Sequence, residues 1–124
     1  MPTTETFIVS QTWTAPSGVT SVLAECWGGG TAGTNGIPGD VGGVGGVGGS
    51  YAKTLVITVV PGNNYSVVVG APGGTLTSSF VGAAGSCIAP SGSGGTGDTL
   101  FSGGSGASGN LFFGGAGGGG AGSA

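Results

Sequence analysis

Apolar and polar residues alternate between Val19 and Trp27, which predicts a β-strand in this part of the chain. Successive side chains of a strand point to opposite faces, so one face is expected in a core and the other covered or partly wet. The two sets are Val22, Ala24 and Cys26 on one face and Leu23, Glu25 and Trp27 on the other.

Residues 51–60 predict a longer strand, and the connection Pro61 to Asn64 predicts a hairpin into residues 65–69. Residues 7–9 and 76–81 predict shorter strands. No segment predicts a helix, so the pattern favours an all-β, antiparallel β-sandwich of jelly-roll-like form. The long strand is expected to place Leu55, Ile57 and Val59 on one face and Thr54, Val56 and Thr58 on the other.

Glycine fills 34 of the 124 positions, and from Gly30 to Gly48 it recurs at every third residue. Three residues per turn is the repeat of polyproline II, whereas an α-helix repeats at about 3.6 and a strand at about 2. A flexible linker is the alternative for such a composition. A linker, however, needs neither a regular spacing of glycine nor the apolar side chains that these tracts carry. We therefore expect long tracts in a polyproline II-like or extended loop conformation. A less strict repeat runs from Gly82 to Gly109, and Gly114, Gly117 and Gly120 resume it on a shifted phase.

The chain is expected to form one glycine-rich β domain over residues 1–124. Residues 1–81 would supply the sandwich strands, with the tract 30–50 inserted, and residues 82–124 the C-terminal glycine-rich tracts. Three apolar patches interrupt these tracts, and they would either plug the core, which is the favoured interpretation, or form exposed tips. They are Cys87 to Pro90, Leu100-Phe101 and Leu111-Phe112-Phe113.

Charged residues are scarce: one lysine, four acidic residues and no arginine or histidine give a formal net charge of −3. Such a surface cannot neutralise a phosphate backbone, so nucleic acid is not expected as a partner. Without histidine or paired carboxylates, no catalytic residue, metal ligand or cofactor site is predicted, and the chain is not expected to be an enzyme. Lys53 and Glu25 each fall in a predicted strand, where they would form a cross-strand ion pair or else Lys53 would guard an edge strand.

Two cysteines, Cys26 and Cys87, could form a disulfide in an oxidising compartment, but two reduced, buried thiols are favoured. Residues 1–5 carry no basic region followed by an apolar stretch, so no secretory signal is predicted, and no segment is long enough to insert into a membrane. Synthesis in a cytosol, with the chain left there or released by lysis, is the expectation.

Four sequence blocks occur in a fixed order over residues 13–80. Residues 13–22 read Trp-Thr-Ala-Pro-Ser-Gly-Val-Thr-Ser-Val, and a strand that ends in Trp27-Gly28-Gly29 leads into a glycine tract. A strand that starts at Tyr51, the segment Pro61 to Gly70 and the segment Gly73 to Phe80 follow. This order resembles the glycine-rich domain of bacteriophage tail-fibre and receptor-binding proteins, and the C-terminal tracts are similar in style to the stacked glycine-rich helices of phage tail-tip adhesins.

The resemblance implies a virion structural or adhesive module without enzymatic activity, bound to other virion proteins or to a host-surface saccharide or protein. It also implies a homo-oligomer, with a trimer favoured. A capsid decoration protein is the first alternative, and an ice-binding protein the alternative of another class. A collagen-like trimer through residues 30–50 is a further one.

Two sets of residues are singled out for these functions. Uncharged polar groups and exposed rings suit saccharide or protein contacts. The candidate partner or receptor contacts are Leu100, Phe101, Leu111, Phe112, Phe113, Asn63 and Asn64, and the expected structural residues are Trp13, Trp27, Tyr51, Tyr65 and Cys26.

Overall fold

The computed structural model describes residues 3–37, 39, 42–71, 76–110, 115 and 117–120. Within these residues the chain forms seven strands and no helix. The strands are β1 (Gln11–Thr14), β2 (Ser21–Trp27), β3 (Tyr51–Thr58), β4 (Asn64–Val68), β5 (Ser78–Val81), β6 (Ser86–Ala89) and β7 (Thr99–Phe101).

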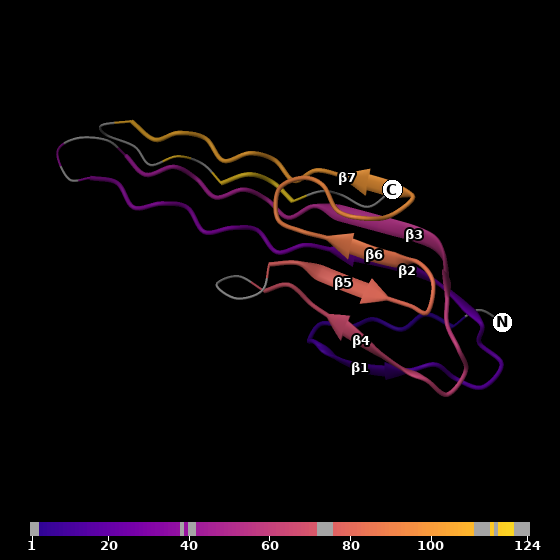
Figure 1. Ribbon diagram of the computed structural model, residues 1–124. Coiled ribbons are helices and arrows are strands. Elements are labelled where there is room, and N and C mark those ends of the chain that lie inside the picture. Colours follow the sequence, from indigo (N-terminus) through magenta and orange to yellow (C-terminus); the bar gives the residue numbers. More distant parts are fainter. Residues whose placement is uncertain are drawn as a thin grey trace.

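The strands form two antiparallel sheets that pack face to face (Figure 1). One sheet has the order β1-β4-β5-β6, and the other has the order β2-β3-β7. This arrangement confirms the predicted all-β, antiparallel sandwich.

The core lies between the two sheets and is built from their inward-facing side chains. Ile57 on β3 and Cys87 on β6 have no exposed surface, and Phe80 on β5 is 8% exposed. Trp13 and Tyr65 pack against Phe80, with ring centroids 5.8 and 5.9 Å from its ring. Aromatic rings at these separations supply much of the apolar area that a small sandwich can bury.

The predicted hairpin between residues 51–60 and 65–69 is wrong. β3 pairs with β2 and β7, whereas β4 pairs with β1 and β5 in the opposite sheet. The turn from Pro61 to Asn64 is hydrogen-bonded to Ala15, directly after β1, and does not fold back on β3. The Gly62 N–H donates to the Ala15 carbonyl, and the Ala15 N–H donates to the Asn63 carbonyl. The turn was correctly placed, but it joins the two sheets.

A β-bulge in β3 overturns part of the predicted face assignment of that strand. Leu55 and Val56 together lie opposite Leu23 of β2, so the alternation slips by one residue. Thr54 is therefore buried and Leu55 is exposed, the reverse of the prediction, whereas Ile57 and Val59 are buried as expected. The Asp98 carboxylate holds the bulge, because its Oδ2 atom accepts a 2.7 Å hydrogen bond from the Leu55 N–H.

Two boundaries of the predicted organisation also differ. Residues 7–9 form no strand, although Phe7 packs against the core. β6 and β7 come from the part of the chain assigned to glycine-rich tracts, and β6 places Cys87 and Ala89 in the core. The patch from Cys87 to Pro90 therefore plugs the sandwich, which is the favoured interpretation.

The core assignment predicts unequal effects at two adjacent positions of β3. Ile57→Ala should lower the free energy of unfolding by about 2–5 kcal/mol, because it leaves a cavity at a side chain without exposed surface. Val56→Ala is the matched control and should change it by less than about 0.5 kcal/mol, since Val56 is 67% exposed. Urea unfolding followed by tryptophan fluorescence measures both, and equal losses would contradict the assignment.

Candidate binding surfaces

Four extended segments project from one end of the sandwich and lie side by side (Figure 1). They comprise residues 28–36, 42–50 and 102–110 and, in the last segment, residues 115 and 117–120. We call this last one segment 115–120, with residue 116 outside the described residues, and refer to all four together as the glycine bundle. Backbone hydrogen bonds join them at intervals of three residues, which is the repeat of polyproline II.

Segment 42–50 is the centre of the bundle, because it is bonded to each of the other three. The three residues of each Gly-Gly-Val repeat form hydrogen bonds with three different segments. The first glycine donates its N–H to segment 102–110, the second accepts from segment 115–120, and the valine accepts from segment 28–36. The bonds, each 2.6–2.9 Å, join Gly42 to Asn110, Gly45 to Ala107, Gly48 to Gly104, Gly115 to Gly43, Gly118 to Gly46, Thr31 to Val47 and Thr34 to Val44.

Thr31 and Thr34 strengthen one of these contacts with their side chains. The Thr31 hydroxyl oxygen accepts a hydrogen bond from the Val47 N–H at 2.8 Å, and the Thr34 hydroxyl oxygen accepts one from the Val44 N–H at 2.9 Å. Both hydroxyls are thus turned toward the centre of the bundle. The regular row of free hydroxyls that an ice-binding face would need is not formed by these two residues.

Gly43 and Gly46 lie outside the strict three-residue repeat of glycine in the sequence. Close approach of segment 28–36 explains why they are nevertheless glycine. A Cβ atom on Gly46 would overlap the Thr31 carbonyl oxygen, and one on Gly43 would overlap that of Thr34. Segments 28–36 and 42–50 also run antiparallel to each other, since Thr31 bonds to Val47 and Thr34 bonds to Val44. Gly39, between them in the sequence, has a φ of +75°. This reversal contradicts the collagen-like alternative, which needs one uninterrupted helix through residues 30–50.

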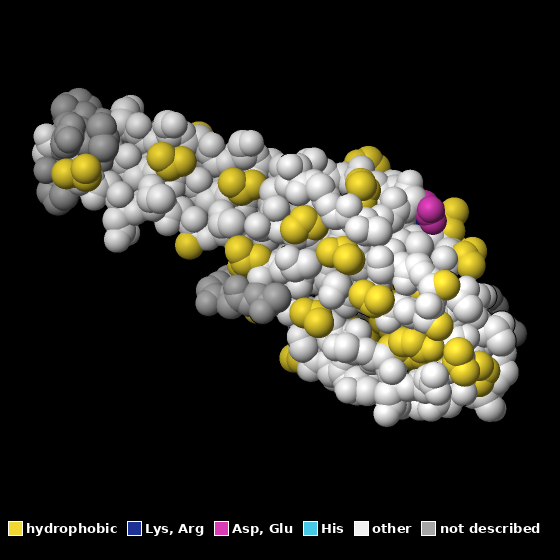
Figure 2. All heavy atoms as spheres, viewed as in Figure 1, with side chains coloured by type: hydrophobic (Ala, Val, Ile, Leu, Met, Phe, Trp, Pro, Cys, Tyr) yellow, Lys and Arg dark blue, Asp and Glu magenta, His cyan; other side chains and the backbone are white. Residues whose placement is uncertain are grey.

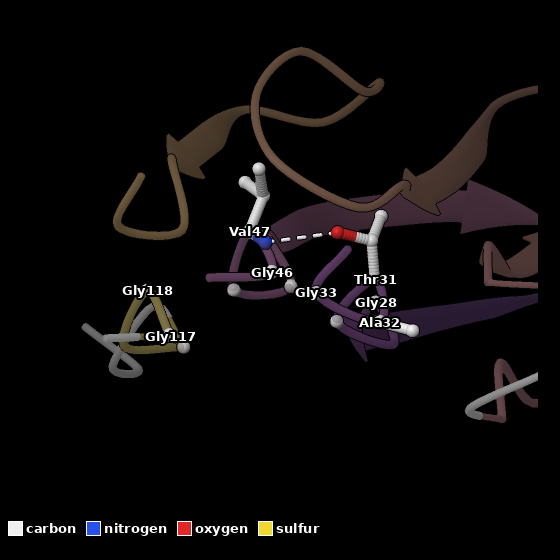
Figure 3. A pocket seen from close by; sticks show the side chains of 12 residues that line it. Gly28, Thr31, Ala32, Gly33, Gly46, Val47, Gly117 and Gly118 are labelled. Carbon is white, nitrogen blue, oxygen red and sulfur yellow. Dashed lines mark hydrogen bonds between the residues drawn. The ribbon is translucent and has the colours of Figure 1, made fainter. Parts of the chain in front are cut away.

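A groove runs along the bundle between segments 28–36 and 115–120, with segment 42–50 as its floor. It consists of two adjoining hollows of about 580 and 420 Å³, which share Gly33, Gly46 and Gly117 in their lining. Figure 3 shows the hollow nearer the sandwich, where the Thr31–Val47 hydrogen bond spans one side and Gly117 and Gly118 face it from the other. The groove is lined mostly by main chain.

A second candidate surface lies on the sheet β2-β3-β7. Trp27, Tyr51 and Phe101 stand directly opposite one another, with ring centroids 5.3 and 5.9 Å apart. Tyr51 is fully buried between its neighbours, whereas Trp27 is 49% and Phe101 44% exposed. The structure therefore brings the predicted contact Phe101 together with the predicted structural residues Trp27 and Tyr51.

An ion pair borders these rings. The Tyr51 hydroxyl donates to Glu25 Oε1 at 2.5 Å, and Lys53 Nζ lies 4.0 Å from the same oxygen. Glu25 and Lys53 are also direct partners in the β2–β3 register, which confirms the cross-strand alternative for the lysine. Such a partly exposed pair contributes only about 0–1 kcal/mol to stability.

The remaining predicted contacts do not join these two surfaces into one site. Asn63 lies in the turn before β4 and Asn64 is the first residue of β4, and both are exposed. This turn is at the end of the sandwich away from the bundle (Figure 1). The side chain of Asn64 accepts a 2.6 Å hydrogen bond from the Thr14 hydroxyl. Leu100 is 44% exposed on β7, and Leu111, Phe112 and Phe113 lie outside the described residues.

The surface offers little chemistry besides hydrogen bonding and apolar contact. The four bundle segments contain no charged residue, and the face in Figure 2 carries isolated apolar side chains along the bundle with almost no charge. Among the described residues no cluster of three or more histidine, cysteine or acidic side chains is positioned to hold a metal ion. The same part of the chain contains no helix that is long and apolar enough to cross a membrane.

No family model, curated protein or solved structure is significantly similar to this chain. The resemblance to phage glycine-rich domains therefore rests on the sequence blocks described above. The groove was not predicted. Gly117 and Gly120 keep the three-residue spacing but are out of step with the repeat from Gly82 to Gly109, and this break indicated that a separate segment of the bundle begins there.

Cys26 and Cys87 are free thiols that face each other inside the sandwich. The Cys87 thiol donates to the Ala52 carbonyl at 3.3 Å, and the Cys26 thiol donates to the Cys87 carbonyl at 3.5 Å. The contact with the Cys87 side chain, together with burial, raises the pKa of the Cys26 thiol far above its usual range.

The contact with the Cys26 side chain lowers the pKa of Cys87 instead, but this thiol has no exposed surface. Both thiols should therefore resist alkylation by iodoacetamide at pH 8 in the folded protein and react fully in denaturant: Cys26 because it is buried and its thiolate, the nucleophile, is disfavoured, and Cys87 because burial denies the reagent access. Mass spectrometry counts the modified residues. Thiols that stay unmodified in denaturant until a reductant is added would instead show a disulfide.

The close contacts at Gly46 predict a loss of order in the bundle on substitution. Gly46→Ala should destabilise the bundle by about 1–3 kcal/mol, because its methyl group overlaps a carbonyl oxygen. Hydrogen exchange of amides 28–50 should accelerate. Gly119→Ala is the control, since a Cβ atom there meets nothing within 4 Å, and equal exchange in both variants would contradict the packing.

Proposed function

We propose that this chain is a surface module of a bacteriophage virion, placed at a tail fibre or tail tip. The sandwich serves as the base, and the glycine bundle serves as a stiff spacer that carries a contact surface away from it. The observation that supports this proposal most directly is the projection of four hydrogen-bonded segments from one end of the sandwich (Figure 1).

The bundle is suited to a spacer because its cohesion comes from the main chain. Segment 42–50 is held from three sides, so bending it would break bonds to several neighbours together. A spacer without charge also avoids salt-dependent attraction to nucleic acid and to acidic surfaces. Its exposed groups are mainly hydroxyls, amides and small apolar side chains, which suit neutral saccharides or protein surfaces.

The far end of the bundle is where contact with a host surface is proposed. Ile37 is 59% exposed there, and Asn110 is exposed beside the last described bond of segment 102–110. Leu111, Phe112 and Phe113 follow Asn110 directly in the sequence. An apolar run of sequence directly after an amide residue has the composition of a small binding tip.

Two alternatives are weighed by the same features. A capsid decoration protein would use the sandwich as a lattice contact and needs no projection, so the bundle favours the tail. An ice-binding face needs regular free hydroxyls, whereas those of Thr31 and Thr34 are engaged with Val47 and Val44.

Immunogold electron microscopy of the phage particles that copurify with the chain tests the location. Label at a tail or fibre tip is the expected result, whereas label over the capsid would favour the decoration protein. Pre-immune antibody provides the control for the label. A chain that copurifies with no particle would overturn both virion functions.

A further inference from the structure

Asn35 is the only one of the four asparagines of the chain that is followed by glycine. In an Asn-Gly sequence, the backbone nitrogen of the glycine can attack the side-chain amide carbon of the asparagine and close a succinimide ring. A side chain on the following residue hinders this attack, and glycine has none. Asn35 and Gly36 therefore have the local chemistry of a deamidation site.

The hydrogen bonds of segment 28–36 end one residue before this pair. Thr34 is held twice by Val44, because its N–H donates to the Val44 carbonyl and its hydroxyl accepts from the Val44 N–H. Beyond Thr34, neither the Gly36 N–H nor the Asn35 side chain makes a hydrogen bond to any described residue. The attacking nitrogen and the amide that it attacks are thus both free to meet without breaking a bond of the fold.

Solvent reaches both residues of the pair. Asn35 and Gly36 are exposed, and both line the outer hollow of the groove, which has a volume of about 420 Å³. A base in the solvent can therefore remove the proton of the Gly36 nitrogen, and water can open the ring once it has formed.

The other three asparagines lack this combination of features. Each is followed by a residue with a side chain that hinders the attack: Asn63 precedes Asn64, Asn64 precedes Tyr65, and Asn110 precedes Leu111. The Asn64 side chain also accepts a hydrogen bond from the Thr14 hydroxyl, and the Asn110 carbonyl accepts one from the Gly42 N–H. Reaction at Asn35 is therefore expected to be selective.

We infer that Asn35 is a site of spontaneous modification, at which the folded chain deamidates through a succinimide. The Gly36 nitrogen loses its proton to a solvent base and forms a bond to Asn35 Cγ. The bond from Cγ to the amide nitrogen breaks, and this nitrogen takes up a proton and leaves as ammonia. Water then opens the ring at Cγ to give aspartate, or at the Asn35 backbone carbonyl carbon to give isoaspartate.

Both products place a carboxylate on a bundle whose four segments contain no charged residue. Isoaspartate also routes the main chain through the side-chain carbons of residue 35. The last hydrogen bonds of segment 28–36 lie before this position, so the bundle keeps its bonds while the charge near its far end changes. The inference does not depend on the proposed virion function, since the reaction needs only this chain and water.

Incubation of the purified full chain at pH 8 over several weeks tests the site. Ion-exchange chromatography should show a more acidic form that accumulates with time. Pepsin digestion at low pH and mass spectrometry should place the change at Asn35, and an isoaspartyl methyltransferase should methylate the product, because it labels isoaspartate and not aspartate. An unchanged wild type would overturn the inference, as would an acidic form without isoaspartate, which would show direct hydrolysis of the amide.

Two matched variants test the assignment to one residue. Asn35→Gln should lose the acidic form, because the longer side chain closes a ring far less readily, whereas Asn63→Gln should form it at the wild-type rate. Equal thermal unfolding of the two variants shows that the fold is kept. An Asn35→Gln variant that reacts like the wild type would place the site elsewhere and overturn the inference.

The same incubation in denaturant tests whether the fold leaves the pair free. Asn35 should react at similar rates in the folded and the denatured chain, since no described hydrogen bond restrains the pair. A folded chain that stays unmodified while the denatured chain reacts would show that the bundle protects Asn35, and it would also overturn the inference.

Discussion

The hydrogen bonds of segment 42–50 to three neighbours are the interaction on which the glycine bundle depends. Ordering a residue's backbone costs about 1–2 kcal/mol, and glycine lies at the upper end. A hydrogen bond returns only about 0.5–1.5 kcal/mol net, so a single pair of such segments would not hold together. In the central segment each Gly-Gly-Val repeat makes bonds on three sides, and the threonine hydroxyls of segment 28–36 add another. Cohesion is therefore a property of the surrounded segment and not of any one pair.

The sandwich fixes the register in which the bundle forms. Three bundle segments adjoin strands of one sheet in the sequence: 28–36 follows β2, 42–50 precedes β3, and 102–110 follows β7. The segments lie in the same spatial order as these strands. The pairing that sets Trp27 opposite Tyr51 continues without a slip into the bond from Gly28 to Ser50 and then into those further along. Only the interval between bonds changes, from the two-residue repeat of a sheet to a repeat of three. Because one end of each segment is already paired in a folded sheet, the entropic cost of bringing the glycine tracts together is reduced.

The sequence carried enough local information to predict the strands but not their partners. Alternation identified the two faces of β2, and the cross-strand position of Glu25 and Lys53 followed from strands that were correctly placed. The bulge at Leu55 and Val56 could not be foreseen, because it is held by Asp98, 43 residues away. The turn after β3 has hairpin chemistry, yet long-range bonds to Ala15 redirect it to the other sheet. In the tracts, the three-residue period was visible, but two closely packed glycines, Gly43 and Gly46, lie outside that period, and only their contacts with segment 28–36 show why they are glycine.

A bundle held by its main chain separates the scaffold from the surface that it displays. In a helical bundle or a sandwich, the side chains that make the core also restrict what the exterior can carry. Here a neighbour excludes any side chain at positions such as Gly46 and Gly118, while exposed positions such as Ala32 and Asn35 make no hydrogen bond to another described segment of the bundle. Outward residues can therefore change with little effect on cohesion.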